Sequence, residues 1–115
     1  MDCIFCKIAR KEIPADVLYE DEEVIAFRDA HPIAPVHILM IPKKHIASIV
    51  DVSEEDTLLM GKLVRAAKKI AEDLKISRDG YKLLFRVGEH GGQEVGHIHL
   101  HLIGGAKLSE GIRPV

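Results

Sequence analysis

The stretch from His97 to Ile103 reads His-Ile-His-Leu-His-Leu-Ile, so three histidines alternate with aliphatic residues. Strict alternation of this kind is typical of a half-buried β-strand. In a strand all three imidazoles project from one face, while the aliphatic residues between them face a core on the other. A helix would turn His99 away from His97 and His101. The stretch is therefore predicted to be a strand that carries a histidine cluster.

Three imidazoles so close together are hard to explain by packing, because each carries a polar ring nitrogen that needs a partner. The cluster suits metal binding, or nucleophilic and acid–base chemistry near neutral pH. One alternative is a zinc hydrolase whose catalytic metal is held jointly by His97, His99 and His101. Against it, alternate side chains on a straight strand lie about 6.5–7 Å apart and converge poorly on one ion.

The composition is that of an ordinary globular protein, with 115 residues, 47% hydrophobic and 30% charged. We expect a single domain over residues 1–115. The formal net charge of −2 gives no reason to expect a nucleic-acid partner, and no apolar run is long enough to span a bilayer. The first residues lack the pattern of a signal peptide, so we expect a cytoplasmic location and two reduced cysteines.

Hydrophobic periodicity and turn residues predict an α+β fold with a mostly antiparallel sheet. The strand at 37–41 is apolar on both faces, which predicts a central position. The expected elements are a short helix at 3–10, a hairpin of strands at 17–20 and 24–28, a loop at 29–35, the strand at 37–41, a helical turn at 44–49, a helix from Ser53 to about Leu74 that starts in a capping box with Asp56, and a strand at 81–87.

A glycine-rich loop, Gly88–Gly96, leads into the histidine strand. Its glycines allow backbone N–H groups to converge on an anion. A flexible hairpin loop is the plain alternative. The position beside three histidines favours phosphoryl or nucleotidyl transfer, with Gln93 as an added neutral donor. The chain has neither a P-loop nor a dinucleotide-binding fingerprint.

Several motifs in this order resemble the histidine triad (HIT) superfamily over nearly the whole chain, and within it the Hint branch of purine nucleoside phosphoramidases. The Gly-Gly pair after the histidines looks like Hint, since the dinucleoside polyphosphate hydrolase branch usually has Pro-Arg there. The motifs are Phe27-x-Asp29, Ala34-Pro35-Val36-His37, Ile41-Pro42-Lys43-Lys44-His45, Gly91-Gly92-Gln93 and His97-x-His99-x-His101-x-x-Gly104-Gly105.

The resemblance implies an α+β fold with a five-stranded sheet, one long helix and one or two short ones, and two sheets joined in a homodimer. It also implies a hydrolase that cleaves purine nucleoside 5′-phosphoramidates, such as AMP joined to lysine, through a nucleotidyl-histidine intermediate. The alternatives are a purine-nucleotide-binding module with little turnover and a dinucleoside polyphosphate hydrolase.

The same resemblance assigns roles by position. His99 is implied as the nucleophile, His101 as the group that binds phosphate and assists proton transfer, and His37 as its support, with His97 completing the cluster. Asp29 is implied to hold the ribose hydroxyls, and Gln93 to contact the α-phosphate together with loop amides. The residues implied to line the base pocket are Ile4, Phe5, Phe27 and Leu39. The other residues implied to bind the substrate are Arg86, Glu94 and Val95.

Cys3-x-x-Cys6 has metal-ligand spacing but supplies only half of a zinc site. The resemblance implies that His45 and His97 complete it, which gives a structural rather than catalytic zinc. No organic cofactor is expected.

Three residues depart from the Hint pattern. Arg86 stands where many members carry an asparagine near the phosphate, Glu94 where a small hydroxyl residue is common, and Gly96 where an aromatic residue is common. We expect these changes to affect substrate preference and rate rather than the core reaction.

Overall fold

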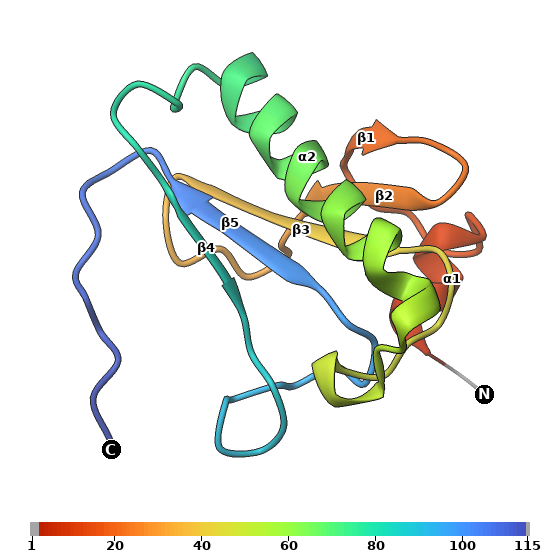
Figure 1. Cartoon of the computed structure of the whole chain (residues 1–115). Coiled ribbons are helices and arrows are strands. Elements are labelled where there is room, and N and C mark those ends of the chain that lie inside the picture. Colours follow the sequence, from red (N-terminus) through yellow and green to blue (C-terminus); the bar gives the residue numbers. More distant parts are fainter. Residues whose placement is uncertain (1–2, 115) are drawn as a thin grey trace.

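The five strands form one antiparallel sheet in the order β1-β2-β3-β5-β4 (Figure 1), in a computed structural model that describes residues 3–114. The fold class predicted from the sequence is therefore confirmed. The elements are α1 (Ile4–Ala9), β1 (Val17–Glu20), β2 (Val24–Arg28), β3 (Val36–Pro42), the 3₁₀ turns η1 (Ile49–Asp51) and η2 (Glu54–Asp56), α2 (Thr57–Asp73), β4 (Lys82–Phe85) and β5 (Leu100–Gly104).

Strand β3 lies at the centre of the sheet, as its apolar character on both faces predicts. It pairs with β2 on one side, where Phe27 is opposite Leu39, and with β5 on the other, where Leu39 is opposite His101. Every residue from His37 to Pro42 is buried. The two hairpin strands β1 and β2 have the boundaries that the sequence predicts.

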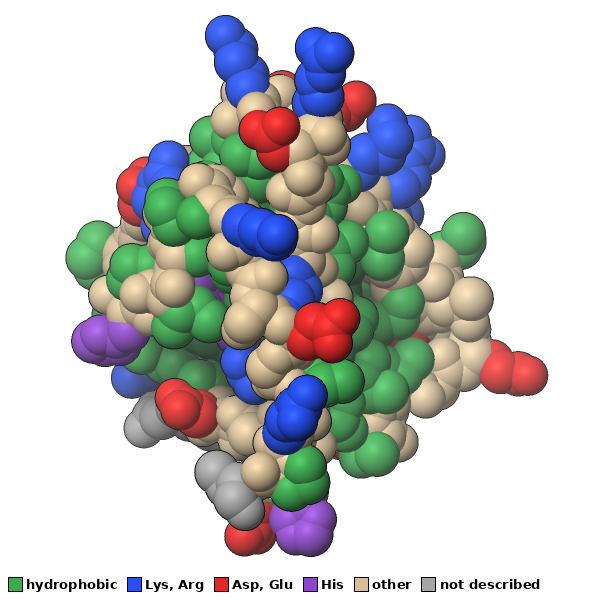
Figure 2. Space-filling model, turned by 90° about the vertical axis from the view of Figure 1, so that its left-hand side faces the viewer, with side chains coloured by type: hydrophobic (Ala, Val, Ile, Leu, Met, Phe, Trp, Pro, Cys, Tyr) green, Lys and Arg blue, Asp and Glu red, His purple; other side chains and the backbone are tan. Residues whose placement is uncertain are grey.

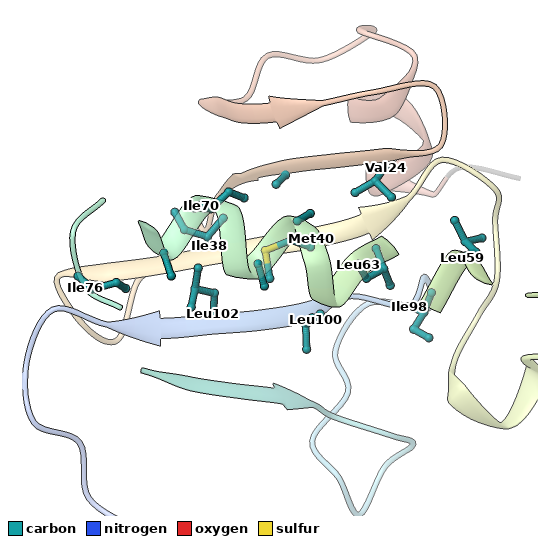
Figure 3. Packing of buried hydrophobic residues seen from close by; sticks show 14 of the residues in the cluster. Val24, Ile38, Met40, Leu59, Leu63, Ile70, Ile76, Ile98, Leu100 and Leu102 are labelled. Carbon is teal, nitrogen blue, oxygen red and sulfur yellow. The ribbon is translucent and has the colours of Figure 1, made fainter. Parts of the chain in front are cut away.

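Helix α2 covers one face of the sheet (Figures 1 and 3). The apolar side chains on one side of α2 pack against every second side chain of β2, β3 and β5. Together they form one apolar layer between the helix and the sheet. Ile98, Leu100 and Leu102 belong to this layer, which confirms that the aliphatic half of the alternating stretch faces the main core. The helix contributes Leu59, Leu63, Ala66, Ala67, Ile70 and Ala71.

The start of the long helix is fixed by the predicted capping box. The Ser53 N–H donates to Asp56 Oδ2 at 3.0 Å, and Lys44 Nζ donates to Asp56 Oδ1 at 2.7 Å. The first turn after Ser53 is 3₁₀, and the α-helix proper begins at Thr57. The helical turn expected at 44–49 lies later, at Ile49–Asp51, with Ser48 as its N-cap.

The opposite face of the sheet carries α1 and the histidines. A second apolar cluster lies there, and the short helix packs on it. His97, His99 and His101 are all buried, at 0, 7 and 6% exposure. The sheet therefore separates a purely apolar core from a layer rich in polar rings.

The strand predicted from His97 is shorter than expected, because β5 begins at Leu100. The last pair of the β3–β5 ladder is Met40 with Leu100. Two further steps in the same register would pair Pro42 with Ile98. Pro42 has no N–H to donate, and the N–H of Ile98 donates instead to the carbonyl of Ile46 at 2.7 Å. Strand β4 is likewise shorter than the predicted 81–87.

Within residues 3–114, no helix combines the length and apolar character needed to cross a membrane. On the face drawn in Figure 2, lysine and arginine side chains are interspersed with acidic and apolar ones. This mixed surface is consistent with the formal net charge of −2.

Replacing Leu63 by alanine tests the main core. Leu63 is 0% exposed, and the change should lower the free energy of unfolding by about 2–5 kcal/mol through lost burial and a residual cavity. Leu58→Ala is the matched control on the same helix, because Leu58 is 80% exposed and its truncation should cost about 0.5 kcal/mol or less. Urea unfolding followed by circular dichroism measures both, and equal losses would contradict the packing described here.

Candidate active site and metal centre

The ring of His99 is oriented by the backbone two residues earlier. Its Nδ1 lies 2.8 Å from the carbonyl oxygen of His97, and a carbonyl can only accept. Nδ1 therefore carries the ring proton, and Nε2 of the neutral ring keeps a free lone pair. A histidine held in this tautomer is suited to nucleophilic attack through Nε2.

A chain of hydrogen bonds fixes the other two rings of the site. The backbone N–H of Ile33 donates to Nδ1 of His37 at 3.2 Å, so Nε2 of the neutral His37 ring carries the proton. That Nε2 lies 2.9 Å from Nδ1 of His101. His101 Nδ1 is therefore the acceptor, and the proton of the neutral His101 ring sits on Nε2.

His101 Nε2 is buried and has no hydrogen-bond partner within residues 3–114. A buried donor without a partner is costly unless a ligand satisfies it. The His101 ring lies beside that of His99, with centroids 4.8 Å apart. The unpartnered Nε2–H of His101 and the lone pair on His99 Nε2 therefore lie in one small site. Such a site suits a ligand in which anionic oxygens surround an electrophilic atom.

Burial keeps these rings neutral. The pKa of His101 is lowered to about 4, chiefly by burial and in smaller part by the neighbouring His99, His37 and Arg86. Burial also lowers the pKa of His37, although the Asp29 carboxylate opposes this shift. At neutral pH both rings are therefore uncharged, as the hydrogen-bond chain requires.

Asp29 lies at the edge of the histidine group, directly after β2. Its Oδ2 is 3.3 Å from His37 Nε2, and its Oδ1 accepts the N–H of His31 at 2.8 Å. Asp29, His37 and His101 also bring three potential metal ligands within 4.8 Å of one another. Because His37 Nε2 carries a proton and donates it to His101 Nδ1, neither of these nitrogens is a free metal ligand in this arrangement.

An apolar wall adjoins the histidines. Phe5 packs edge-on against Phe27, with centroids 5.5 Å apart, and against His99 at 5.1 Å. Leu39 belongs to the same cluster, and Val95 packs on it. The structure thus groups three of the four residues predicted to line the base pocket, Phe5, Phe27 and Leu39. The fourth, Ile4, is 50% exposed and lies at the surface.

The glycine-rich loop has a defined conformation. Gly91 lies so close to Val87 that a β-carbon would clash with the Val87 carbonyl oxygen, so only glycine fits there. Both amide hydrogens of Gln93 are engaged, with Ala47 and Val95 carbonyls at 2.7 and 2.9 Å, and Gln93 Oε1 accepts the N–H of Gly88 at 3.0 Å. In this structure Gln93 braces the loop instead of presenting a free donor. Glu94 is exposed.

Four further side chains converge next to His99. Cys3, Cys6, His45 and His97 each direct one ligand atom into a group whose members lie within 4.8 Å of one another, and this group could bind a metal ion. Nδ1 of His97 is 3.4 Å from Cys3 Sγ, 3.5 Å from Cys6 Sγ and 3.2 Å from His45 Nδ1. The Cys-x-x-Cys motif and the two histidines therefore form a cluster of four potential metal ligands.

The ring of His97 is prepared to act as a ligand. Its Nε2 lies 2.8 Å from the carbonyl of Pro42, so the proton sits on Nε2 and Nδ1 faces the two sulfurs. Burial lowers the pKa of His97, although the bond to Pro42 opposes this shift. Burial raises the pKa of the Cys6 thiol, and the neighbouring Cys3 adds to it, so ionising this thiol calls for a cation in the cluster.

Sequence reasoning did not identify which backbone groups set these tautomers. The carbonyls of Pro42 and His97 and the N–H of Ile33 fix which nitrogen of each ring carries the proton. Every residue supplies such groups, so no side-chain pattern could have singled them out.

Comparison with known proteins is consistent across the whole chain. Residues 2–113 match a family model described as the scavenger mRNA decapping enzyme C-terminal binding family. A purine nucleoside phosphoramidase of Escherichia coli (strain K12) is 50% identical over 107 residues, which cover 93% of this chain and 90% of that protein. Protein HitA of Neisseria gonorrhoeae is 47% identical over 90% of this chain and 95% of its own length.

Solved structures agree with the fold. The HIT family hydrolase from Legionella pneumophila Philadelphia 1 superposes with a TM-score of 0.94 at 52% identity, covering 96% of this chain and 98% of that one. A histidine triad protein from Clostridium difficile gives a TM-score of 0.92 at 43% identity, covering 95% of each chain.

The neutral, buried state of His101 predicts a stability that depends on pH. The folded state binds this proton less readily than the unfolded chain, since its pKa falls from 6.5 to about 4. Stability from this group is complete above pH 6.5 and is lost as the pH falls towards 4, with about 2 kcal/mol gone at pH 5. Urea unfolding at pH 7.5 and pH 5 should show this loss in the wild type and a smaller one in His101→Gln. An identical loss in both proteins would contradict the assignment.

Proposed function

The chain belongs to the histidine triad family, and we propose that it is a hydrolase that cleaves purine nucleoside 5′-phosphoramidates. The observation that carries this proposal is the bond from His99 Nδ1 to the His97 carbonyl, which leaves Nε2 free beside the unpartnered Nε2–H of His101. A relative at 50% identity bears the name purine nucleoside phosphoramidase, which supports this substrate class.

In the proposed reaction the base lies on the apolar wall of Phe5, Phe27 and Leu39, and Asp29 binds the ribose hydroxyls. Phe5 lies on α1, Phe27 on β2 and Leu39 on β3, on the same face of the sheet as the histidines, and Asp29 directly follows β2. In the proposed complex the α-phosphorus then lies beside His99.

His99 Nε2 then attacks the α-phosphorus, and the phosphorus–nitrogen bond to the departing amine breaks. The His97 carbonyl stabilises the positive charge that develops on the imidazole, because Nδ1–H donates to it at 2.8 Å. The Nε2–H of His101 donates to a phosphoryl oxygen, which satisfies the buried donor as negative charge accumulates. Water hydrolyses the nucleotidyl-histidine and releases the nucleoside monophosphate; the amine takes up one proton and the water gives one up.

We also propose that zinc binds Cys3, Cys6, His45 and His97 as a structural ion. With Zn–S of about 2.3 Å and Zn–N of about 2.0–2.1 Å, ligand atoms of a tetrahedral site lie about 3.3–3.8 Å apart. The distances from His97 Nδ1 to its three neighbours, 3.2–3.5 Å, fit this set. Through Cys3, Cys6 and His97, a bound ion would tie α1 to the residue whose carbonyl orients His99.

The remaining expectations follow from the family. We propose a single domain that assembles as a homodimer, located in the cytoplasm, without nucleic-acid or membrane partners. In the described sheet β4 pairs only with β5, so its outer edge is free to join a second sheet. Both cysteines are free thiols in the structure, in keeping with a reducing compartment.

The nucleophile is tested by His99→Ala. The variant should lose hydrolysis of an adenosine 5′-phosphoramidate by at least about 10³-fold, because no other lone pair replaces Nε2. Steady-state release of AMP measures the loss, and mass spectrometry after an alkaline quench should find an acid-labile adenylyl group on His99 of the wild type. His31→Ala is the control, since His31 is exposed in a loop. Unimpaired His99→Ala would sink the proposal, and wild type that binds AMP without turnover would make the protein a binding module.

The zinc site is tested by metal analysis of protein purified without an affinity tag. The wild type should contain about one zinc per chain, and Cys6→Ser should lose it, because three ligands and a hydroxyl hold zinc weakly. The melting temperature should fall by more than about 5 °C, which corresponds to about 1 kcal/mol for a domain of this size. His90→Ala, in the exposed loop, should keep both zinc and stability. Wild type with zinc content near zero would count against the site.

A further inference from the structure

Cys3 and Cys6 are the only cysteines in the chain, and their sulfurs face the same ring nitrogen. Nδ1 of His97 lies 3.4 Å from Sγ of Cys3 and 3.5 Å from Sγ of Cys6, and the two sulfurs lie within 4.8 Å of each other. Both residues are free thiols in the structure. A disulfide within one chain must therefore join these two residues.

The backbone between the two cysteines permits a disulfide without refolding. Cys3 is the N-cap of α1 and Cys6 lies in its first turn, where the Cys6 N–H donates to Cys3 Sγ at 3.5 Å. Cα atoms three residues apart at the start of a helix are separated by about 5 Å, inside the range of about 4.4–6.8 Å that disulfides span. Rotation about the side-chain bonds then brings the sulfurs to their bonding distance of about 2.05 Å.

The two sulfurs differ in their access to a small oxidant. Cys3 is buried, whereas Cys6 is half-buried and its Sγ lies 3.2 Å from Nδ1 of His45, which is exposed. An oxidant from solvent therefore meets Cys6 first, and Cys3 lies behind it as the second thiol. An accessible sulfur beside a resolving one is typical of redox-sensing cysteines.

We propose that Cys3 and Cys6 form a modification site for hydroperoxides, at which a reversible disulfide expels the bound metal ion and weakens binding at the apolar wall. Only the last effect rests on the proposed function, because that function assigns the base to the wall. In a reducing compartment such a disulfide is transient, as a regulatory bond requires.

The reaction with hydrogen peroxide consumes two thiolates and one peroxide. The Cys6 thiolate attacks a peroxide oxygen, the O–O bond breaks, and Cys6 becomes a sulfenic acid as one hydroxide leaves. The Cys3 thiolate then attacks Cys6 Sγ, the S–O bond breaks, and a second hydroxide leaves. The sulfurs lose the two electrons that reduce the peroxide. Metal ligation needs thiolates, so only His45 and His97 remain, too few for a zinc site.

Phe5 connects the cysteine pair to the rest of the site, because it lies between the two cysteines in the chain. Its ring packs against Phe27, with centroids 5.5 Å apart, and against His99 at 5.1 Å. Drawing the two sulfurs together shifts the helical turn that carries this ring. The apolar wall then loses its fit to a planar ligand.

The test treats the zinc-loaded protein with hydrogen peroxide in the presence of a chromophoric zinc chelator. Zinc release should match disulfide formation one to one, with the disulfide measured by the loss of both iodoacetamide-reactive thiols in the denatured protein. Calorimetric affinity for AMP should fall by about 10-fold, the size of one lost aromatic contact. Dithiothreitol with added zinc should restore it.

Two variants sharpen this test. In Cys3→Ser, peroxide should carry Cys6 to a sulfinic acid, because no resolving thiol remains, and mass spectrometry detects the two added oxygens. Met60→Leu is the control, since it removes a partly buried, peroxide-sensitive side chain of α2 and should leave zinc release unchanged.

Several results would overturn the inference. Sulfinic acid on Cys6 of the wild type would mean that Cys3 does not resolve it, and disulfide-linked chains on a non-reducing gel would mean that the thiols pair between chains. Zinc retained after the disulfide forms, a wild type without zinc, or an unchanged AMP affinity would each reject the proposed effect. A wild type without turnover sinks only the proposed function, because the thiol, zinc and AMP-binding measurements need no turnover.

Discussion

The hydrogen bond from His99 Nδ1 to the carbonyl of His97 is the constraint on which the rest of the site depends. This hydrogen bond needs no second side chain, because the acceptor is the backbone carbonyl two residues earlier. It fixes the tautomer, so the nucleophilic nitrogen points away from the backbone without an activating base. The carbonyl can do this because His97 and His99 lie just before β5, where no strand partner competes for it.

His97 connects two functions of the histidine face. Its carbonyl orients His99, its Nε2 donates to Pro42, and its Nδ1 faces the two cysteines and His45. Metal binding would therefore immobilise the same residue that positions the nucleophile. Pro42 contributes twice, because it ends the ladder between β3 and the histidine segment and supplies the carbonyl that orients the His97 ring.

The sheet separates stability from chemistry. The face under α2 is packed with aliphatic side chains and holds none of the site histidines, whereas the other face accommodates buried rings whose neutral state requires burial and a continuous hydrogen-bond chain. The price of this arrangement is the orphaned donor on His101, a buried polar group left for a ligand to satisfy. Strand order then spreads this face laterally, from the apolar wall over β2 and β3 to the histidines at β5.

The sequence by itself determined the elements, the faces and the residue types of the site. Alternation placed Ile98, Leu100 and Leu102 in the core, the capping box marked the start of the long helix, and the Cys-x-x-Cys motif pointed to half of a metal cluster. Periodicity is local, so these features are readable within a few residues. Only the tertiary structure decided which ring nitrogen carries each proton, that Cys3 meets a histidine 94 positions away, that Gln93 braces its loop and that Arg86 lies beside Gly92 of that loop. Those features depend on contacts between distant segments and on backbone carbonyls, which every residue possesses and no local pattern distinguishes.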